Sequence, residues 1–499
     1  MTVSEGRVLM LQGTASHAGK TVLAAAVCRS YARRGYRVAP FKAQNMALNS
    51  FVTAEGGEMG RAQVVQARAA GLEPHVDMNP VLLKPSAGGT SQVVVMGSPV
   101  GHMTVAEYQA YQAEIWPVVT GALDRLRAAH DLIVVEGAGS SAEVNLRGRD
   151  IVNMRVALHA SAPVLLVGDI DLGGVFASLL GHVELFTPEE RALVAGFIIN
   201  KFRGDAGQLG PGIKILHERT GVPTLGVVPY LEDWRGDEED SVAIDGLVRR
   251  GRPGAPLRIA VIRLPFISNF PDADALAAEP DVDVRFVDSR EGLEGAAAIV
   301  LPGSKSTISD LEWLRRRGLA DAVQAAATAG TPVVGLCGGY QMLGRRLLDP
   351  HHVESELDAV DGLGLLDAVT TFSAAKRTLR VTGEVMGDRL APPGTPVAGY
   401  EIHMGRTELG PGAAPLLRLR GAGEVARPEG AVAGSVAGTY LHGLFDHLEL
   451  RAAFLNRLRA ARGLPPRPAV EPSGDDIDRL ADHVEKHLDM NALDAIVAV

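Results

Sequence analysis

The sequence of 499 residues contains only two cysteines, Cys28 and Cys337, which lie far apart in different contexts. Two such residues form neither a disulfide framework nor a thiolate metal cluster, and they suit a reducing cytoplasm. The sequence also has no apolar run near the roughly 18 residues of a membrane span, and no secretory signal precedes its first expected strand. We therefore expect a cytoplasmic protein without a membrane partner.

Basic segments are scarce as well. The 49 lysines and arginines are outnumbered by 59 aspartates and glutamates, which gives a net charge of −10, and no Lys/Arg-rich tract compensates for it. This balance argues against a nucleic-acid partner, and an anionic substrate would need a local group of basic residues. Nothing in the sequence specifies an oligomeric state.

A chain of 499 residues is too long for one hydrophobic core and predicts two or three domains. Residues 232–256 are acidic and then rich in Arg, Gly and Pro, without apolar periodicity, which is typical of a linker. We therefore expect one domain over residues 1–231 and another over residues 257–499. Residues 473–490 combine a helix-capping pattern with apolar positions at helical spacing, and they predict a packing helix near the end of the second domain.

Both domains show short apolar runs separated by helical segments, which indicates α/β folds with parallel sheets. The first domain opens with a strand, a helix and a second strand, expected at residues 7–13, 20–34 and 36–41. Later apolar runs complete a sheet of about six parallel strands; they are residues 132–135, 163–168, 194–199 and 224–228. In the second domain, strands are expected at residues 257–264, 282–287, 297–301 and 332–336.

The turn after the first strand has the composition of a phosphate-binding loop. It reads Gly13-Thr14-Ala15-Ser16-His17-Ala18-Gly19-Lys20-Thr21. Backbone N–H groups from Gly13, Thr14 and Gly19 can surround the phosphate oxygens of ATP. Lys20 can pair with the β- and γ-phosphates, and Thr21 can hold Mg²⁺. Five residues, rather than the four of a Walker A loop, separate the two glycines, so the loop is a variant; a plain Gly/Ala-rich turn with a surface lysine is the alternative.

Polar residues follow several buried strands at the ends where open parallel sheets bind ligands. Glu136 ends the run at residues 132–135, so its carboxylate is expected over the phosphate loop as a Mg²⁺ ligand. A strand-end acid held by backbone donors is the alternative. Asn200 follows another strand and predicts a contact to the nucleotide. Asp169 and Asp171 could serve a metal, the substrate or the N-cap of the next helix.

The segment after the second strand is rich in amides and reads Lys42-Ala43-Gln44-Asn45-Met46-Ala47-Leu48-Asn49-Ser50. Its residues Lys42, Gln44 and Asn45 predict contacts to the substrate or to phosphate. Further along the chain, Glu58 stands just before a helix that is expected to run to about Ala70. Glu58 could ligate a metal, or it could complement the positive N-terminus of that helix, which is the simpler interpretation.

Cys337 stands between a strand and a helix. The short apolar run before it suits a central parallel strand, and Gly338 and Gly339 permit a tight turn into the helix. Unpaired N–H groups and the dipole at a helix N-terminus favour a thiolate, so Cys337 is the candidate nucleophile. The N–H groups of Gly338 and of Gly303, which also lies between a strand and a helix, could hold an oxyanion. The alternative is a small apolar core residue.

A base for this nucleophile has to come from elsewhere in the chain. His442 follows a short β-run in Gly438-Thr439-Tyr440-Leu441-His442-Gly443 and is our candidate. His403 competes with it, whereas His351 and His352 lie in an acidic, proline-containing loop and are expected at the surface. No carboxylate lies two residues after His442, because Leu444 stands there, so no third group that would orient the histidine is evident.

The two sets of residues point to one reaction. A Cys/His pair with an oxyanion site hydrolyses amides, and a phosphate loop with acidic strand ends hydrolyses a nucleotide or transfers phosphate from it. A carboxylate phosphorylated by ATP becomes an acyl phosphate that ammonia can attack, and glutamine hydrolysed at Cys337 would supply that ammonia. The sequence therefore predicts an ATP-dependent amidation that uses Mg²⁺ and glutamine.

Nearly the whole chain resembles the cobyric acid synthase family, the glutamine-dependent amidating enzymes of adenosylcobalamin biosynthesis. The matching segments are residues 13–21, 41–46, 49–50, 58–63, 136–140, 169–176, 200–205, 301–310, 337–344 and 438–443. The resemblance implies an α/β fold with an N-terminal P-loop-type parallel sheet domain that is dethiobiotin-synthetase-like. It implies a C-terminal α/β domain that is similar to class I glutamine amidotransferases.

The resemblance also implies a reaction. It is the amidation of the b, d, e and g carboxylates of adenosylcobyrinic acid a,c-diamide, with one ATP and one glutamine for each. The nucleophile is then Cys337, and His442 is the histidine of the glutaminase site. The absence of an acid soon after His442 departs from most class I amidotransferases and is typical of this subgroup.

Two other functions fit parts of the sequence. Cobyrinic acid a,c-diamide synthase has the same domain order and chemistry but acts on other carboxylates of the macrocycle. The segments 42–50 and 58–63 favour the first interpretation. A nucleotide-switched binding or partitioning ATPase with a non-catalytic amidotransferase domain is a function of a different class. The presence of both Cys337 and His442 speaks against it.

Overall fold

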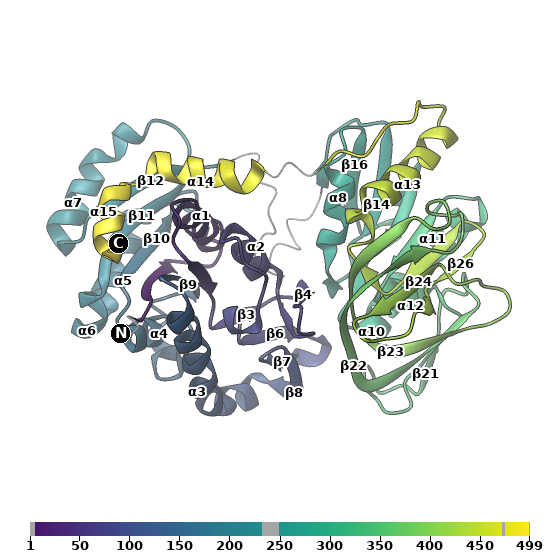
Figure 1. Ribbon diagram of the computed structural model, residues 1–499, viewed down its shortest axis with the longest axis horizontal. Helices are drawn as coiled ribbons and strands as arrows, with labels where there is room; N and C mark the ends of the chain where they lie inside the picture. The colour runs from purple at the N-terminus through teal and green to yellow at the C-terminus, as the bar shows by residue number, and fades with distance from the viewer. Residues whose placement is uncertain (1–4, 232–248, 472–474, 499) are drawn as a thin grey trace.

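The structure is a computed structural model, and it describes residues 5–231, 249–471 and 475–498. Figure 1 shows two α/β bodies side by side, the first running from purple to teal and the second from teal to green. Most of the expected linker, residues 232–248, lies outside the described residues. In the three described stretches, no helix combines the length and the apolar character needed to cross a membrane.

The first domain is built on a six-stranded parallel sheet, as the sequence predicts. Its order is β12-β11-β10-β1-β9-β2. The strands are β1 (Arg7–Gly13), β2 (Val38–Phe41), β9 (Leu132–Ser140), β10 (Val164–Asp169), β11 (Val194–Phe202) and β12 (Thr224–Pro229). Its main helices are α1 (Lys20–Arg33), α3 (Val105–Ala129), α4 (Met154–Ala160), α5 (Val175–Leu185), α6 (Pro188–Ala192) and α7 (Gly210–Thr220).

Helices cover both faces of this sheet. Val8 and Met10 of β1 pack in a hydrophobic cluster with residues of α3 and α5, whereas Leu9 and Leu11 pack with residues of α1 on the other face. Successive side chains of a strand point to opposite faces of the sheet. Because helices cover both faces, every residue of such a strand is buried. This explains why the strands read as continuous apolar runs.

A smaller lobe of the first domain faces the second domain. It contains the four-stranded sheet β3-β6-β7-β8 and the antiparallel pair β4-β5. These elements are β3 (Gln44–Met46), β4 (Ser50–Val52), β5 (Glu58–Gly60), β6 (Val81–Pro85), β7 (Thr90–Val95), β8 (Ser98–Thr104) and the helix α2 (Arg61–Ala69). The amide-rich segment 42–50 therefore leads from the main sheet into this lobe.

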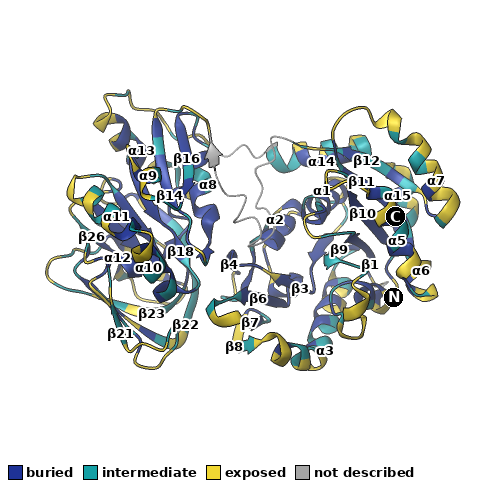
Figure 2. Cartoon of the chain, turned by 180° about the vertical axis from the view of Figure 1, so that it is seen from behind, coloured by how far each residue is buried: buried dark blue, intermediate teal, exposed yellow. Residues whose placement is uncertain are grey.

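The second domain has a seven-stranded sheet in the order β13-β16-β14-β17-β19-β27-β26, with five parallel strands at its centre. Its strands are β13 (Arg249–Gly251), β14 (Leu257–Ile262), β16 (Val282–Val287), β17 (Ala298–Leu301), β19 (Val333–Leu336), β26 (Ala431–Ala433) and β27 (Val436–Thr439). The helices that accompany it are α8 (Asp274–Ala277), α9 (Arg290–Leu293), α10 (Thr307–Arg316), α11 (Leu319–Thr328), α12 (Gly338–Leu343) and α13 (Leu448–Ala461). Figure 2 shows buried residues along these strands and exposed residues on the outer helices.

A second sheet in this domain is dominated by two long strands, β22 (Ala368–Val385) and β23 (Pro396–Leu409), which pair antiparallel. Its shorter strands are β20 (Arg346–Leu348), β21 (Ala359–Asp361), β24 (Leu417–Gly421), β25 (Arg427–Glu429) and β28 (Leu441–His442). A separate antiparallel pair consists of β15 (Ile267–Ser268) and β18 (Gly303–Ser304). Strand β23 pairs with β28 at Tyr400 and His442. The antiparallel pair of β22 and β23 therefore borders the candidate glutaminase site.

The C-terminal helices α14 (Asp475–His487) and α15 (Met490–Val497) differ from the expected division of the chain. They pack on the first domain, beside α1 in Figure 1, while α13 stays with the second domain. Leu480 and Leu493 join the hydrophobic cluster of α1, and Arg29 on α1 pairs with Asp478 at 2.6 Å. The expected domain of residues 257–499 is therefore corrected, because the apolar face of this terminal segment covers the first sheet.

Candidate active sites

Cys337 occupies a strained turn between β19 and α12. Its backbone has φ of 50° and ψ of −109°, and a positive φ is unusual for a residue with a Cβ. Close packing of the backbone holds the turn: a Cβ added to Gly339 would lie 2.1 Å from the carbonyl oxygen of Leu301. Gly338 and Gly339 thus permit the sharp strand-to-helix turn that the sequence predicts. This turn presents Cys337 at a helix N-terminus.

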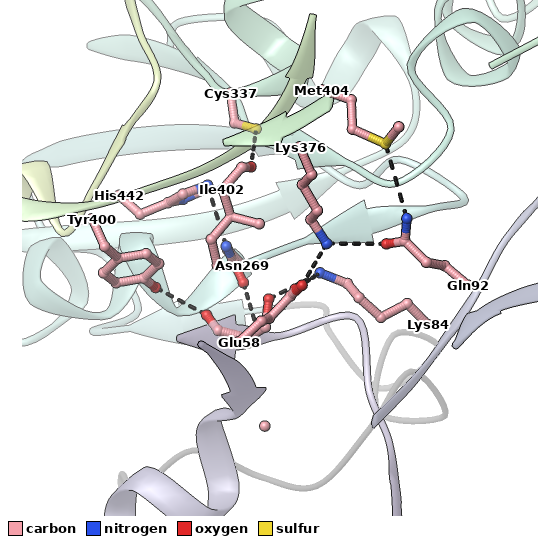
Figure 3. A network of polar contacts seen from close by, with 12 residues as sticks. Glu58, Lys84, Gln92, Asn269, Cys337, Lys376, Tyr400, Ile402, Met404 and His442 are labelled. Atoms are coloured by element: carbon pink, nitrogen blue, oxygen red, sulfur yellow. Dashed lines mark hydrogen bonds and ion pairs between the residues drawn. The ribbon is translucent and has the colours of Figure 1, made fainter. Parts of the chain in front are cut away.

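His442 lies in the same small cavity as Cys337. This cavity of about 50 Å³ is also lined by polar side chains of both domains, among them Lys84, Gln92, Lys305, Gln341 and Glu354. The thiol of Cys337 donates to the carbonyl oxygen of Ile402 over 3.3 Å. Figure 3 shows the thiol and the imidazole on neighbouring elements of the second domain. The structure therefore brings together the two residues that we predicted as nucleophile and base.

A carboxylate missed by the sequence analysis completes this arrangement. Oδ2 of Asp272 lies 2.6 Å from Nδ1 of His442, and Oδ1 of Asp272 accepts from the backbone N–H of Gly443 over 3.1 Å. Both side chains are buried. Burial alone would lower the pKa of His442, but the charge and hydrogen bond of Asp272, with Cys337 nearby, raise this pKa to about 10. The trio has the geometry of a nucleophile, a base and an orienting acid.

His403, the competing base, lines the cavity but has other contacts. Its Nδ1 lies 3.1 Å from the carbonyl oxygen of Gly405, and its ring stacks on Tyr440 with 3.7 Å between ring centres. Burial lowers the pKa of His403 to about 4, so the ring is neutral at physiological pH. His351 and His352 are exposed, as expected.

The two oxyanion candidates flank the nucleophile differently. Gly338 is the first residue of α12, directly after Cys337, and a Cβ on it would lie 2.8 Å from the backbone nitrogen of Ser304. Gly303 belongs to β18 and pairs with Ser268 of β15, one residue before the cavity-lining Ser304. Their roles as N–H donors to an oxyanion stay predictions.

The loop at residues 13–21 wraps around the ammonium group of Lys20. Nζ of Lys20 donates to the carbonyl oxygens of Ala15 and Gly139 at 3.1 Å each, which places this buried lysine between the loop and the end of β9. Gly19 has φ of 90° and lies against Asn200, whose amide donates to the carbonyl oxygen of Ala18 over 2.9 Å. Asn200 therefore supports the loop, and its predicted contact to the nucleotide stays a prediction.

Glu136 is fully buried at the end of β9 and collects three polar partners. Oε1 accepts from the hydroxyl of Thr21 at 2.7 Å and from Nζ of Lys42 at 2.9 Å, and Oε2 accepts from the amide of Gln66 at 2.6 Å. Burial opposes ionisation of Glu136, but Lys42 and the two neutral donors hold its pKa below the usual value. Thr21 beside an ionised carboxylate is the donor set that Mg²⁺ takes next to nucleotide phosphates. The three donors to Glu136 are side chains, so the alternative of a carboxylate held by backbone N–H groups does not describe this residue.

A large cavity of about 600 Å³ opens beside this cluster. Lys20 and Lys42 line it, together with the amide side chains of Gln44, Asn45 and Asn153. The cavity therefore combines cationic groups for phosphate or carboxylate with amide groups for a polar ligand. Asp169 lies further along the sheet edge, where Lys201 donates to it over 2.8 Å, and Asp171 lies near Arg203.

Glu58 lies between two lysines, and its tentative assignment as a metal ligand stays a prediction. Its fully buried carboxylate accepts from Nζ of Lys84 at 2.6 Å through Oε1 and from Nζ of Lys376 through Oε2. Burial disfavours the charge, but the two ammonium groups hold the pKa of Glu58 well below its usual range. A cation would have to displace both lysines. Because Lys376 belongs to the second domain, this ion pair joins the two domains (Figure 3).

Comparisons with known proteins agree with both halves of the chain. Residues 9–242 match the family model described as the CobQ/CobB/MinD/ParA nucleotide binding domain. Residues 258–449 match the model described as the CobB/CobQ-like glutamine amidotransferase domain. The chain is 52% identical to a cobyric acid synthase of Desulforudis audaxviator over 99% of both chains. It is 51% identical to one of Sorangium cellulosum over 98% of both, and 49% identical to one of Moorella thermoacetica over 99% of this chain and 98% of the other.

Fold, site and comparisons define a class: a nucleotide-binding domain of the P-loop type joined to a glutamine amidotransferase domain, which is a glutamine-hydrolysing ligase. Within this class, the chain belongs to the cobyric acid synthase family.

Proposed function

We propose that the chain catalyses the ATP- and glutamine-dependent amidation of the b, d, e and g carboxylates of adenosylcobyrinic acid a,c-diamide, which yields adenosylcobyric acid. The observation that carries this proposal is the pairing, in one chain, of a buried Cys337–His442–Asp272 site with a cavity lined by Lys20 and Lys42. The names of the relatives identify the reaction family and support the macrocyclic acid as substrate.

In the glutaminase half, the proton of the Cys337 thiol has passed to Nε2 of His442, and Sγ attacks the carboxamide carbon of glutamine as a thiolate. Asp272 at Nδ1 stabilises the resulting imidazolium. The N–H groups of Gly303 and Gly338 hold the oxyanion of the tetrahedral intermediate. His442 then returns the proton to the departing nitrogen, ammonia leaves, and water hydrolyses the thioester to release glutamate.

In the synthetase half, a carboxylate of the macrocycle attacks the γ-phosphorus of ATP and releases ADP. Ammonia attacks the acyl phosphate, and phosphate leaves with the formation of the amide. The N–H groups of Gly13, Thr14 and Gly19 surround the phosphates, and Lys20 neutralises their charge. Lys42, Gln44, Asn45 and Asn200 contact the acid or the nucleotide. Thr21 and Glu136 would hold Mg²⁺, which supplies further charge neutralisation at the phosphates when bound.

The alternative reaction is that of cobyrinic acid a,c-diamide synthase, which amidates other carboxylates of the same macrocycle. The amide-rich segment 42–50 supports the first reaction, because Lys42, Gln44, Asn45 and Met46 line the large cavity. A nucleotide-switched ATPase with a non-catalytic amidotransferase domain is less well supported. Burying the carboxylate of Asp272 beside His442 is unfavourable for folding, and an inactive domain would have no use for this arrangement. The free thiol of Cys337 suits a reducing compartment such as the cytoplasm.

One experiment tests the proposal. The purified chain is incubated with ATP, Mg²⁺, glutamine and adenosylcobyrinic acid a,c-diamide, and the products are analysed by mass spectrometry. We expect products that carry one to four added amides and, at completion, four. Amidation of cobyrinic acid but not of its a,c-diamide would favour the alternative synthase. ATP hydrolysis without any amidation would contradict both reactions.

A further inference from the structure

The cavity at Cys337 is lined by three lysines, and two of them share one acid. Nζ of Lys84 donates to Oε1 of Glu58 over 2.6 Å. Nζ of Lys376 donates to Oε2 of the same carboxylate and, over 3.0 Å, to the amide oxygen of Gln92 (Figure 3). The ammonium groups of these two lysines therefore have their partners within the protein.

The third lysine, Lys305, has no such partner. Among the residues that the structure describes, its Nζ forms neither a hydrogen bond nor an ion pair. Burial lowers the pKa of Lys305, and the charge of Glu354 offsets part of this shift. An ammonium group that lines a cavity without a bonded anion is suited to bind an anionic group of a ligand.

The backbone holds Lys305 beside the nucleophile. Lys305 stands between Ser304 and Thr307, and both of these lie against the residue that follows the cysteine. A Cβ on Gly338 would lie 2.8 Å from the backbone nitrogen of Ser304 and 3.2 Å from the hydroxyl oxygen of Thr307. The backbone N–H of Lys305 itself donates to the carbonyl oxygen of Phe266 over 2.9 Å. The segment that carries the lysine is therefore fixed against the turn of the nucleophile.

The same cavity contains an acid, Glu354, in the loop between β20 and β21. The carboxylate of Asp349 holds this loop, because it accepts from the backbone N–H groups of residues 353–355 over 2.8 or 2.9 Å. Oε2 of Glu354 accepts from the backbone N–H of Thr307, at the start of α10, over 2.9 Å. In the described parts of the chain, no ion pair joins Glu354 to Lys305 or to another cation. The acid and the lysine are therefore held apart in one cavity.

Two separated charges of opposite sign match the α-carboxylate and the α-ammonium group of a free amino acid. Lys305 and Glu354 are half-buried, whereas Cys337 and His442 are buried. An amino acid bound between the two charges keeps its charged end nearer to solvent, where less desolvation is needed, and directs its side chain towards the nucleophile. In glutamine, two methylene groups separate this charged end from the carboxamide.

We propose that Lys305 binds the α-carboxylate of L-glutamine and that Glu354 binds its α-ammonium group. The two contacts direct the carboxamide to Cys337 and discriminate against carboxamides that lack either charge. Each contact is a charge-assisted hydrogen bond, and a ligand without the matching group leaves a half-buried charge unpaired. The proposal rests on the proposed assignment of Cys337 and His442 as the glutaminase pair.

Glu354 gives the binding of glutamine a pH dependence. Burial and the charge of Asp349 raise the pKa of Glu354 to about 7. Lys305 and the backbone N–H of Thr307 oppose this shift. Asp310 of α10, whose own pKa burial raises to about 7, lies close enough for its charge and that of Glu354 to repel each other. Because the ionised carboxylate binds the α-ammonium group, KM for L-glutamine should fall as pH rises from about 6 to about 8.

Substrate analogues test the two contacts separately. 4-Carbamoylbutanoate is glutamine without the α-ammonium group, and 4-aminobutanamide is glutamine without the α-carboxylate. The full chain is supplied with ATP, Mg²⁺ and adenosylcobyrinic acid a,c-diamide, and the acid released from each carboxamide is quantified. We expect kcat/KM of the wild type to be roughly 10- to 100-fold lower for each analogue than for L-glutamine, the range set by one hydrogen bond to a charged group.

Glu354→Gln and Lys305→Met remove the partners from the protein. Each should lower kcat/KM for L-glutamine roughly 10- to 100-fold, mainly through KM. Glu354→Gln should change the hydrolysis of 4-carbamoylbutanoate by less than about twofold, because this analogue cannot make the contact. The same holds for Lys305→Met with 4-aminobutanamide. The decline of KM with pH should also disappear in Glu354→Gln.

Two further variants serve as comparisons. Glu356→Gln alters an exposed acid of the same loop that is not among the residues lining the cavity, and it should keep the wild-type kcat/KM for all three carboxamides. Lys376→Met removes a lysine that Glu58 already binds, so it should affect L-glutamine and 4-aminobutanamide by the same factor. Amidation driven by ammonium chloride shows that each variant is folded.

Several outcomes would overturn the proposal. One is that the wild type hydrolyses either analogue as well as L-glutamine, which needs no variant. Another is that Glu354→Gln or Lys305→Met loses the same factor on L-glutamine and on the matching analogue, since the residue would then act on the fold of the site. A third is that Lys376→Met, in place of Lys305→Met, distinguishes L-glutamine from 4-aminobutanamide.

Cys337→Ala is assayed in parallel to separate the proposal from the function on which it rests. Hydrolysis of L-glutamine by this variant would contradict the glutaminase assignment itself. If Cys337→Ala is inactive with L-glutamine, a negative result with the analogues concerns only the binding of the α-amino acid group by Lys305 and Glu354.

Discussion

Oδ2 of Asp272 lies 2.6 Å from Nδ1 of His442, although 170 residues of the chain separate the two. Asp272 comes from the turn after β15, and His442 comes from β28 at the end of the second sheet. The short distance and the burial of both groups couple the ionisation of the histidine to the charge of the acid. This coupling has a measurable consequence for stability.

The free energy of unfolding should depend on pH through this pair. The pKa of His442 is raised to about 10 in the folded protein, against about 6.5 in an unfolded chain. The folded state therefore binds this proton more tightly, and the stabilisation is complete below about pH 6.5 and is lost as pH rises towards about 10. Asp272→Asn lowers the pKa of His442 and should flatten this decline. Urea unfolding of both proteins at several pH values measures it, and equal slopes would contradict the coupling.

Cys337→Ala should separate the two nitrogen sources. Without the thiol, glutamine-driven amidation should fall by about a thousandfold or more. Amidation driven by ammonium chloride should continue, because the synthetase cavity lies in the other domain. Cys28→Ala is the matched control, since Cys28 is buried in α1 and its burial raises the pKa of the thiol. It should keep both activities. Loss of both activities in folded Cys337→Ala would exclude separate sites.

Lys20→Ala should abolish amidation from either nitrogen source. Lys20 lies within the loop that is expected to hold the phosphates, and loss of its charge should slow amidation by roughly a hundredfold or more. Product formation is measured with glutamine and with ammonium chloride. The exposed Lys214 on α7 provides a control, since Lys214→Ala should have no effect. Substantial turnover of Lys20→Ala with ammonium would show that this lysine is not at the phosphates.

The buried ion pair between Lys376 and Glu58 should contribute to the joining of the domains. A double-mutant cycle with Lys376→Met and Glu58→Gln should give a coupling free energy of roughly 1–3 kcal/mol, because each single change leaves a buried charge with one partner fewer. Urea unfolding supplies the four free energies. The exposed pair Arg418 and Glu384 is a control and should give less than about 1 kcal/mol. Similar values for both pairs would refute the role of burial.

Gly339→Ala should destabilise the turn at Cys337. Its new Cβ would lie 2.1 Å from the carbonyl oxygen of Leu301, so the backbone has to shift, at a cost of roughly 1–3 kcal/mol. Gly181 on α5 has open space around its Cα, and Gly181→Ala should instead stabilise the helix by roughly 0.5–1 kcal/mol. Thermal unfolding compares the two variants. No loss of stability in Gly339→Ala would mean that the strand-to-helix turn tolerates a side chain there.

The sequence was informative where the signal is local. The glycine-rich loop before Lys20 and the turn at Cys337 are each contained in fewer than ten residues, and their backbone requirements can be read from glycine positions. The parallel direction of the strands in both main sheets also follows from short apolar runs separated by helices. These features depend on hydrogen bonds and packing within one βα unit.

Other features depend on contacts between distant segments. Asp272 has no fixed spacing from His442, so only the fold identifies it; the one available signal was the buried Asn-Phe-Pro-Asp turn directly after a strand. Glu58 was interpreted from its place before a helix, but its partners Lys84 and Lys376 lie on two other strands. The pattern of α14 predicts a helix with an apolar face and does not say which domain that face covers.

The return of α14 and α15 to the first sheet bears on the order in which the chain folds during synthesis. The second domain can complete its central sheet once β27 has left the ribosome, and its core does not need the last helices. The first domain is synthesised earlier, yet one face of its sheet lacks Leu480, Leu488 and Val497 until the second domain has been synthesised. The half of the protein made first is therefore the half whose core closes last.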